Sequence, residues 1–148
     1  MKVLVALSDL SDEPSDPIAA VASFPWPEGS EIHVLSVAEM IQPAMVGMGP
    51  DAIDLANVQL DFKDEARHTV ARATARLRRS GFQAEGITLE GAPETAIIDH
   101  AKTWGADLIV VGMRDRSLLE RLLLSSISEG VVKHAPCSVL VIKHGPAA

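Results

Sequence analysis

The sequence predicts a single α/β domain in which helices cover both faces of a doubly wound parallel sheet. Three observations favour this fold. The 148 residues suit one compact core, so we expect residues 1–148 to form one domain. Short aliphatic runs typical of buried strands alternate with stretches of helical periodicity. Each interval between strands has room for a helix, and strands joined in this way pair in parallel through right-handed crossovers.

Five apolar runs predict the strands. In chain order they are residues 3–7, 32–37, 82–89, 108–112 and 139–142. The first and fourth runs are continuously aliphatic, as expected for strands that are covered on both faces. The second follows a turn signal at Glu28 and Gly29, and the fifth follows Pro136. The third run has the weakest strand pattern.

Four periodic stretches between these runs predict helices. They are a short helix that ends before Pro25, a long helix over residues 51–80, and two more over residues 93–104 and 126–133. Proline is tolerated at the start of a helix, so Pro17 suits the first turn of the short helix and Pro93 opens the third. Gly105 is expected to terminate that third helix.

The stretch 51–80 is the longest periodic segment. Its apolar residues are spaced three and four apart, so they share one face of a helix. They are Leu55, Val58, Phe62, Ala66, Val70, Ala73 and Leu77. Asp51 and Asp54 lie in the predicted first turns and three arginines in the last, which suits the helix dipole. We expect Gly81 to cap this helix and the apolar stripe to face the core.

Charge and composition exclude several classes of protein. The net charge of −7 argues against binding to nucleic acid or to an anionic membrane. The five aromatic residues include no tyrosine, so a base-stacking platform is not expected. The apolar run near Met1 is too short for a signal peptide or a membrane span. The single cysteine, Cys137, fits a reducing compartment, and we expect a cytoplasmic protein.

The ends of two predicted strands carry residues suited to a ligand site. In doubly wound sheets, ligands bind beyond the carboxyl ends of the strands, where the strand order reverses. The first strand ends in Ser8 and Asp9, and the fourth runs into residues 112–115. Residues 1–65 carry a net charge of −10 and residues 66–148 a net charge of +3, so an anionic ligand favours the second half.

Common catalytic and metal-binding signatures are missing from the sequence. There is no Gly-x-Ser-x-Gly elbow, no Walker A lysine and no complete dinucleotide fingerprint. His134 and Cys137 form only one pair, whereas zinc takes three or four protein ligands. The patterns around His33, His68 and His100 favour packing or surface positions. We therefore expect a non-enzymatic protein with no catalytic residue and no metal ligand.

Three segments in the second half resemble the universal stress protein family. They are residues 107–112 (DLIVVG), 122–129 (LLLSSISE) and 134–141 (HAPCSVLV). The segments PWPEG and VLSV in the first half are similar to one branch of the family, and the element order agrees throughout. The resemblance implies a five-stranded parallel sheet of order 3-2-1-4-5, as in adenine nucleotide alpha-hydrolase-like proteins. It also implies a homodimer through the last strand, from Ser138 to Ile142.

The resemblance implies a nucleotide site as well. Nucleotide-binding members share a glycine, two residues, a second glycine, nine residues, and then a glycine followed by Ser or Thr. Glycines let backbone N–H groups surround phosphates closely. In this sequence Gly112 matches the first glycine and Ser126 the final hydroxyl. By the same resemblance, Asp9 lies beside the adenine or ribose and the Val37 backbone lies at the adenine edge.

Two of the three glycines are replaced in this chain. Asp115 stands at the second position and Ser125 at the third. The Asp115 carboxylate repels phosphate, whereas Arg114 and Arg116 either neutralise it or reach phosphate themselves. Ser125 is a milder change, since its hydroxyl can donate to an oxygen or cap the following helix.

These departures leave two functions open. The first is a regulatory stress-response domain with weakened or lost ATP binding that acts as a homodimer through protein partners. The alternative is a domain that binds ATP, or hydrolyses it slowly, with Mg²⁺ beside the phosphates. In a variant of the alternative, AMP or another small adenine-containing ligand occupies the same crevice, where Asp115 is harmless.

Overall fold

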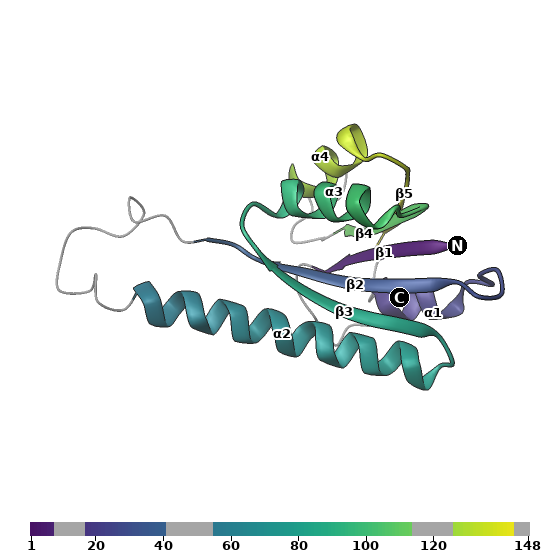
Figure 1. Cartoon of the computed structure of the whole chain (residues 1–148), viewed down its shortest axis with the longest axis horizontal. Helices are drawn as coiled ribbons and strands as arrows, with labels where there is room; N and C mark the ends of the chain where they lie inside the picture. Colours follow the sequence, from purple (N-terminus) through teal and green to yellow (C-terminus); the bar gives the residue numbers. More distant parts are fainter. Residues whose placement is uncertain (8–16, 41–54, 114–125, 144–148) are drawn as a thin grey trace.

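The structure is a computed structural model that describes residues 1–7, 17–40, 55–113 and 126–143 (Figure 1). The strands are β1 (Lys2–Leu7), β2 (Glu31–Ala38), β3 (Gln83–Glu90), β4 (Leu108–Met113) and β5 (Ser138–Lys143). The helices are α1 (Pro17–Ser23), α2 (Leu55–Arg79), α3 (Pro93–Trp104) and α4 (Ser126–His134). Each element lies where an apolar run or a periodic stretch of the sequence predicts it.

The strands form one parallel sheet of five strands in the order β3-β2-β1-β4-β5. This confirms the predicted doubly wound fold and the strand order that the family resemblance implies. β1 lies at the centre, where the chain crosses from one half of the sheet to the other. β3 and β5 are the two edge strands. The carboxyl ends of β1 and β4 are therefore neighbours at the point where the strand order reverses.

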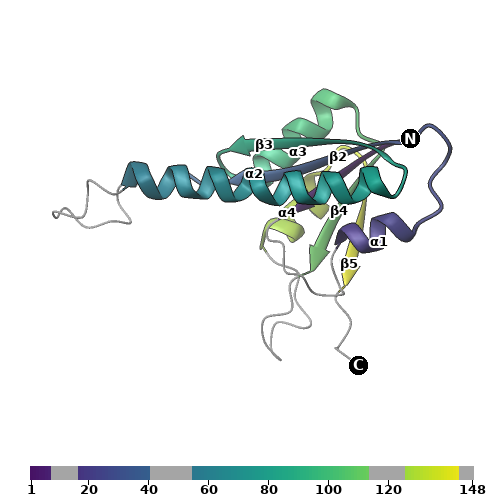
Figure 2. The ribbon, with the colours of Figure 1, turned by 90° about the horizontal axis from the view of Figure 1, so that it is seen from below.

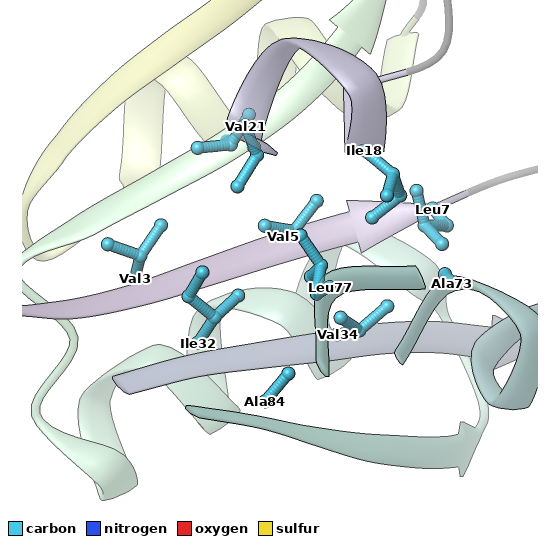
Figure 3. Close-up of a cluster of buried hydrophobic side chains, with 11 residues drawn as sticks. Val3, Val5, Leu7, Ile18, Val21, Ile32, Val34, Ala73, Leu77 and Ala84 are labelled. Atoms are coloured by element: carbon cyan, nitrogen blue, oxygen red, sulfur yellow. The ribbon is translucent and has the colours of Figure 1, made fainter. Parts of the chain in front are cut away.

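Helices cover both faces of the sheet (Figures 1 and 2). Side chains alternate along β1, so Val3 and Val5 point to one face and Leu4 to the other. The first face packs against Ile18 and Val21 of α1 and against Ala73 and Leu77 of α2 (Figure 3). The second face packs against α3 and α4 through Ile97, Ala101 and Val131. Burial on both faces explains why the central strands are continuously apolar.

The prediction for the apolar stripe of α2 is correct only from Ala66 onward. Ala66, Val70, Ala73 and Leu77 are buried, but Val58 is 38% exposed and Phe62 is 43% exposed. The first turns of α2 extend past the ends of the strands, so the apolar residues there have no sheet to cover (Figures 1 and 2). The first predicted turn, with Asp51 and Asp54, lies outside the described residues.

No helix in the described ranges is long and apolar enough to cross a membrane.

α2 and β3 approach each other closely at Gly86. A Cβ atom at this position would lie 2.5 Å from Cγ1 of Val70 and 2.9 Å from Oγ1 of Thr74. That hydroxyl is buried and has no hydrogen-bond partner among the described residues. Glycine is therefore required here because of the spacing between helix and strand, which the sequence pattern alone does not indicate.

Two predicted glycine caps are confirmed. Gly105 follows α3 with φ of 77°, and its N–H donates to the carbonyl of Ala101. Gly81 follows α2 with φ of 91°. Positive φ values are readily adopted by glycine, so these residues end the two helices where the sequence predicts.

Candidate functional site

The strands β2, β1 and β4 lie side by side in the middle of the sheet, and their carboxyl ends are level with one another, so that they form one edge. Leu7 of β1 pairs with Ser36 of β2, and Ala6 pairs with Val111 of β4. Val37 and Gly112 therefore stand close to the end of β1, one on each side. Neighbouring strands lie about 4.8 Å apart, so β2 and β4 are about 10 Å apart across β1. This is the edge at which ligands bind in doubly wound sheets.

The first turn of α4 is fastened to the end of β4. The hydroxyl of Ser128, which is buried, donates a hydrogen bond to the carbonyl of Gly112 at 3.2 Å. This hydroxyl therefore contacts a strand residue that lies 16 positions earlier in the chain. This contact sets the distance between Gly112 and the N-terminus of α4. A helix N-terminus offers unpaired N–H groups and a positive dipole end to an anion.

The described residues contain part of the predicted site. Val37 lies in β2, where it pairs with Leu89 of β3. Gly112 lies within β4, where it pairs with Ile142. Ser126 is the first residue of α4. The Ser128 contact thus places Gly112 close to the first turn of α4.

The remaining predicted site residues lie outside the described residues. They are Asp9, Arg114, Arg116 and Ser125, together with Asp115. Asp9 follows β1 in the chain, and the other four belong to the segment between β4 and α4. Their predicted roles toward a nucleotide therefore stay predictions.

α2 is tied to the same edge of the sheet at β2 and β3. Lys63 of α2 forms an ion pair with Glu90, the last residue of β3. The side-chain amide of Gln59 donates to the carbonyl of Glu39, just beyond β2, at 3.2 Å. Both contacts lie on the β2–β3 side of the edge.

His134 and Cys137 have separate environments. Nδ1 of His134 donates to Oε1 of Glu94 at 3.1 Å and to the carbonyl of Gly130 at 3.0 Å, and this contact joins α4 to the first turn of α3. Burial, and secondarily the charge of Asp107, raises the pKa of the Cys137 thiol, which disfavours the reactive thiolate. No group of three or more His, Cys, Asp or Glu side chains suited to a metal ion occurs in the described ranges.

Comparisons with known proteins agree with this architecture. The family profile described as "Universal stress protein family" matches residues 1–143. Universal stress protein YxiE of Bacillus subtilis is 32% identical over 146 residues, covering 96% of this chain and 98% of the relative. The structure of MJ0577, a protein of Methanocaldococcus jannaschii, is similar with a TM-score of 0.80 at 23% identity, covering 99% and 97% of the two chains. A universal stress protein from Archaeoglobus fulgidus in complex with dAMP has a TM-score of 0.67 at 23% identity, covering 97% and 98%.

Proposed function

Since the chain belongs to the universal stress protein family, we propose that it is a cytoplasmic regulatory domain in which ATP binding is weakened or lost. The observation that carries this proposal is the replacement of two phosphate-binding glycines by Asp115 and Ser125. The domain acts as a homodimer that contacts protein partners, and it needs no catalytic residue. The single cysteine supports a reducing compartment.

The charge of Asp115 is the stronger of the two obstacles to a triphosphate. A carboxylate about 4 Å from a phosphate charge is repelled by about 4 kcal/mol at an effective dielectric constant near 20. A backbone nest of N–H groups also needs residues that allow close approach, which glycine does and a side chain hinders. Arg114 and Arg116 flank Asp115 and offset part of its charge.

The rest of the edge retains features that suit the nucleoside end of a ligand. The level ends of β2 and β4 support a position for adenine beside the Val37 backbone and for a phosphate near Gly112 and Ser126. Asp9 follows β1 and suits the ribose hydroxyls. The start of α4, fastened by Ser128, provides N–H groups for one phosphate without the glycine nest.

A second candidate function follows from the same features. The crevice binds an adenine mononucleotide such as AMP, because a single phosphate carries less charge than a triphosphate and can be held by the N–H groups at the start of α4 without a glycine nest. The Archaeoglobus fulgidus relative in complex with dAMP supports this candidate. Mg²⁺ accompanies the phosphates where a di- or triphosphate binds, held mainly by phosphate oxygens and water.

Thermal unfolding with added nucleotides distinguishes these functions. The purified protein is heated with Mg²⁺ alone, with Mg²⁺ and ATP, and with AMP at the same concentration. We expect little or no rise in Tm with ATP. A ligand present at a hundred times its Kd stabilises by about 2.7 kcal/mol, so tight binding is easily visible. A rise with AMP alone supports the mononucleotide candidate, and a large rise with ATP contradicts weakened ATP binding.

The homodimer is proposed to form through β5. This strand lies at the edge of the sheet, and an aliphatic edge strand is a ready template for pairing with a second copy. Light scattering is expected to give twice the chain mass of 15.7 kDa. Val141→Lys in β5 is expected to shift the mass toward the monomer, whereas Thr88→Lys in the opposite edge strand β3 leaves it unchanged. Wild-type particles of single-chain mass at high concentration contradict this interface.

A further inference from the structure

A cluster of two histidines and a tryptophan lies at the amino end of the sheet, opposite the candidate nucleotide site. His33 is in β2, and His100 and Trp104 lie one turn apart near the C-terminal end of α3. Nδ1 of His33 is 3.1 Å from Nε2 of His100. The rings of His33 and Trp104 are stacked, with centroids 3.6 Å apart and planes inclined by 10°. These contacts attach the end of α3 to the sheet.

Only one proton fits between the two imidazoles. Nε2 of His33 lies 3.5 Å from Oε2 of Glu85, so we assign the His33 proton to this nitrogen. Nδ1 of His33 then accepts a hydrogen bond from Nε2–H of His100. A first additional proton can enter at Nδ1 of His100 and leaves this bond intact. A second must enter at Nδ1 of His33, where it removes the acceptor and places two cations face to face.

The surrounding charges come from all three neighbouring strands. Glu85 of β3 lies nearest and favours a protonated pair, but its side chain is 71% exposed. Glu31 of β2 acts on His33 in the same direction, and Lys2 of β1 acts against it. Lys2 also donates from Nζ to the carbonyl of Trp104 at 3.1 Å, which keeps its positive charge beside the cluster.

Burial is the main influence on both histidines. It lowers the pKa of His33 and the pKa of His100 below the ordinary value of 6.5, and the nearby Glu85 only partly opposes this. The positive charge of His100 lowers the pKa of His33 further. Both rings are therefore neutral above pH 6.5, and the pair is intact there.

We propose that His33 and His100 form a proton-sensitive latch, which holds the end of α3 on β2 while the pair carries no more than one extra proton and releases it when a second enters. In the unfolded chain each histidine binds a proton near pH 6.5. The folded pair binds fewer, so unfolding or release takes up protons and the latch weakens as the pH falls below that value.

The first test follows the two rings separately by imidazole ¹⁵N and ¹H NMR between pH 7.5 and 4.5. We expect His33 and His100 to titrate in two steps more than about one pH unit apart, as coupled groups do. In His33→Gln, the remaining His100 is expected to titrate in one step. In His100→Gln, the remaining His33 is expected to titrate in one step closer to its ordinary value, because the charge of His100 no longer lowers its pKa. His68→Gln, on the exposed face of α2, is the matched control and leaves both curves unchanged. A wild type in which both rings titrate together, unaffected by either substitution at the pair, overturns the latch.

The second test measures the release itself by amide hydrogen exchange, corrected for the intrinsic effect of pH. From pH 7 to pH 5, residues 100–104 of α3 are expected to lose about tenfold more protection than residues 129–134 of α4. His100→Gln retains His33 for stacking on Trp104 and is expected to abolish this extra loss. If His33→Gln does not fold, His100→Gln alone decides the test. Equal loss of protection in α3 and α4 overturns the release, even where the titration shows two steps.

Discussion

Replacement of Asp115 and Ser125 by glycine together is expected to raise the affinity for Mg²⁺-ATP at least a hundredfold. Removing a repulsion of about 4 kcal/mol corresponds to nearly a thousandfold. Arg114 and Arg116 are the sequence neighbours of Asp115, and we expect their positive charges to offset part of this energy, so the expected gain is smaller. Glycine at both positions also restores the close backbone approach that a phosphate nest requires. Isothermal titration calorimetry of the wild type and the double variant measures the change directly.

Two controls separate charge from shape in this experiment. Asp115→Asn removes the charge and keeps the side chain, so it is expected to recover only part of the affinity. The affinity for AMP is expected to change little, because a monophosphate held at the start of α4 carries less charge and does not depend on a glycine nest. Unchanged ATP affinity in the double glycine variant shows that exclusion at this segment is the wrong explanation for weak ATP binding.

Gly86→Ala is expected to lower the free energy of unfolding by about 2 kcal/mol, within the usual range for overpacking a tight contact. The new methyl group would lie 2.5 Å from Cγ1 of Val70 and 2.9 Å from Oγ1 of Thr74, both on the buried face of α2. Val is stiff in a helix, so Val70 cannot turn away without strain, and α2 and β3 have to separate slightly. This cost exceeds the gain of up to about 1 kcal/mol from restricting the unfolded chain. Urea unfolding monitored by circular dichroism measures the loss.

A double-mutant cycle with Val70→Ala tests this cause. Val70→Ala alone is expected to destabilise the protein, because the side chain is buried. In the presence of Val70→Ala, however, Gly86→Ala has more room and is expected to cost at least about 1 kcal/mol less than it does in the wild type. Strictly additive losses show that the two positions are independent and that the close approach does not limit the residue at position 86.

The sequence pattern was sufficient to predict the strands of the sheet and the helices that pack directly on it. Continuous aliphatic residues in β1 and β4 predicted strands covered on both faces, and Pro93 and Gly105 bounded α3 correctly. The same periodicity failed in the first half of α2. A stripe of apolar residues shows which side of a helix is suited to burial, but not how far the sheet beneath it extends. Val58 and Phe62 are exposed for that reason.

By itself the sequence determined the order of strands and helices, the family resemblance, and the two departures from the phosphate-binding glycines at positions 115 and 125. Only the tertiary structure decided that Ser128 fastens α4 to Gly112, and that His33 meets His100 from a position 67 residues away. Local composition dictates local conformation because backbone geometry and side-chain periodicity act over a few residues. Contacts between distant residues depend on strand register and on the packing of layers, which exist only once the whole sheet has formed.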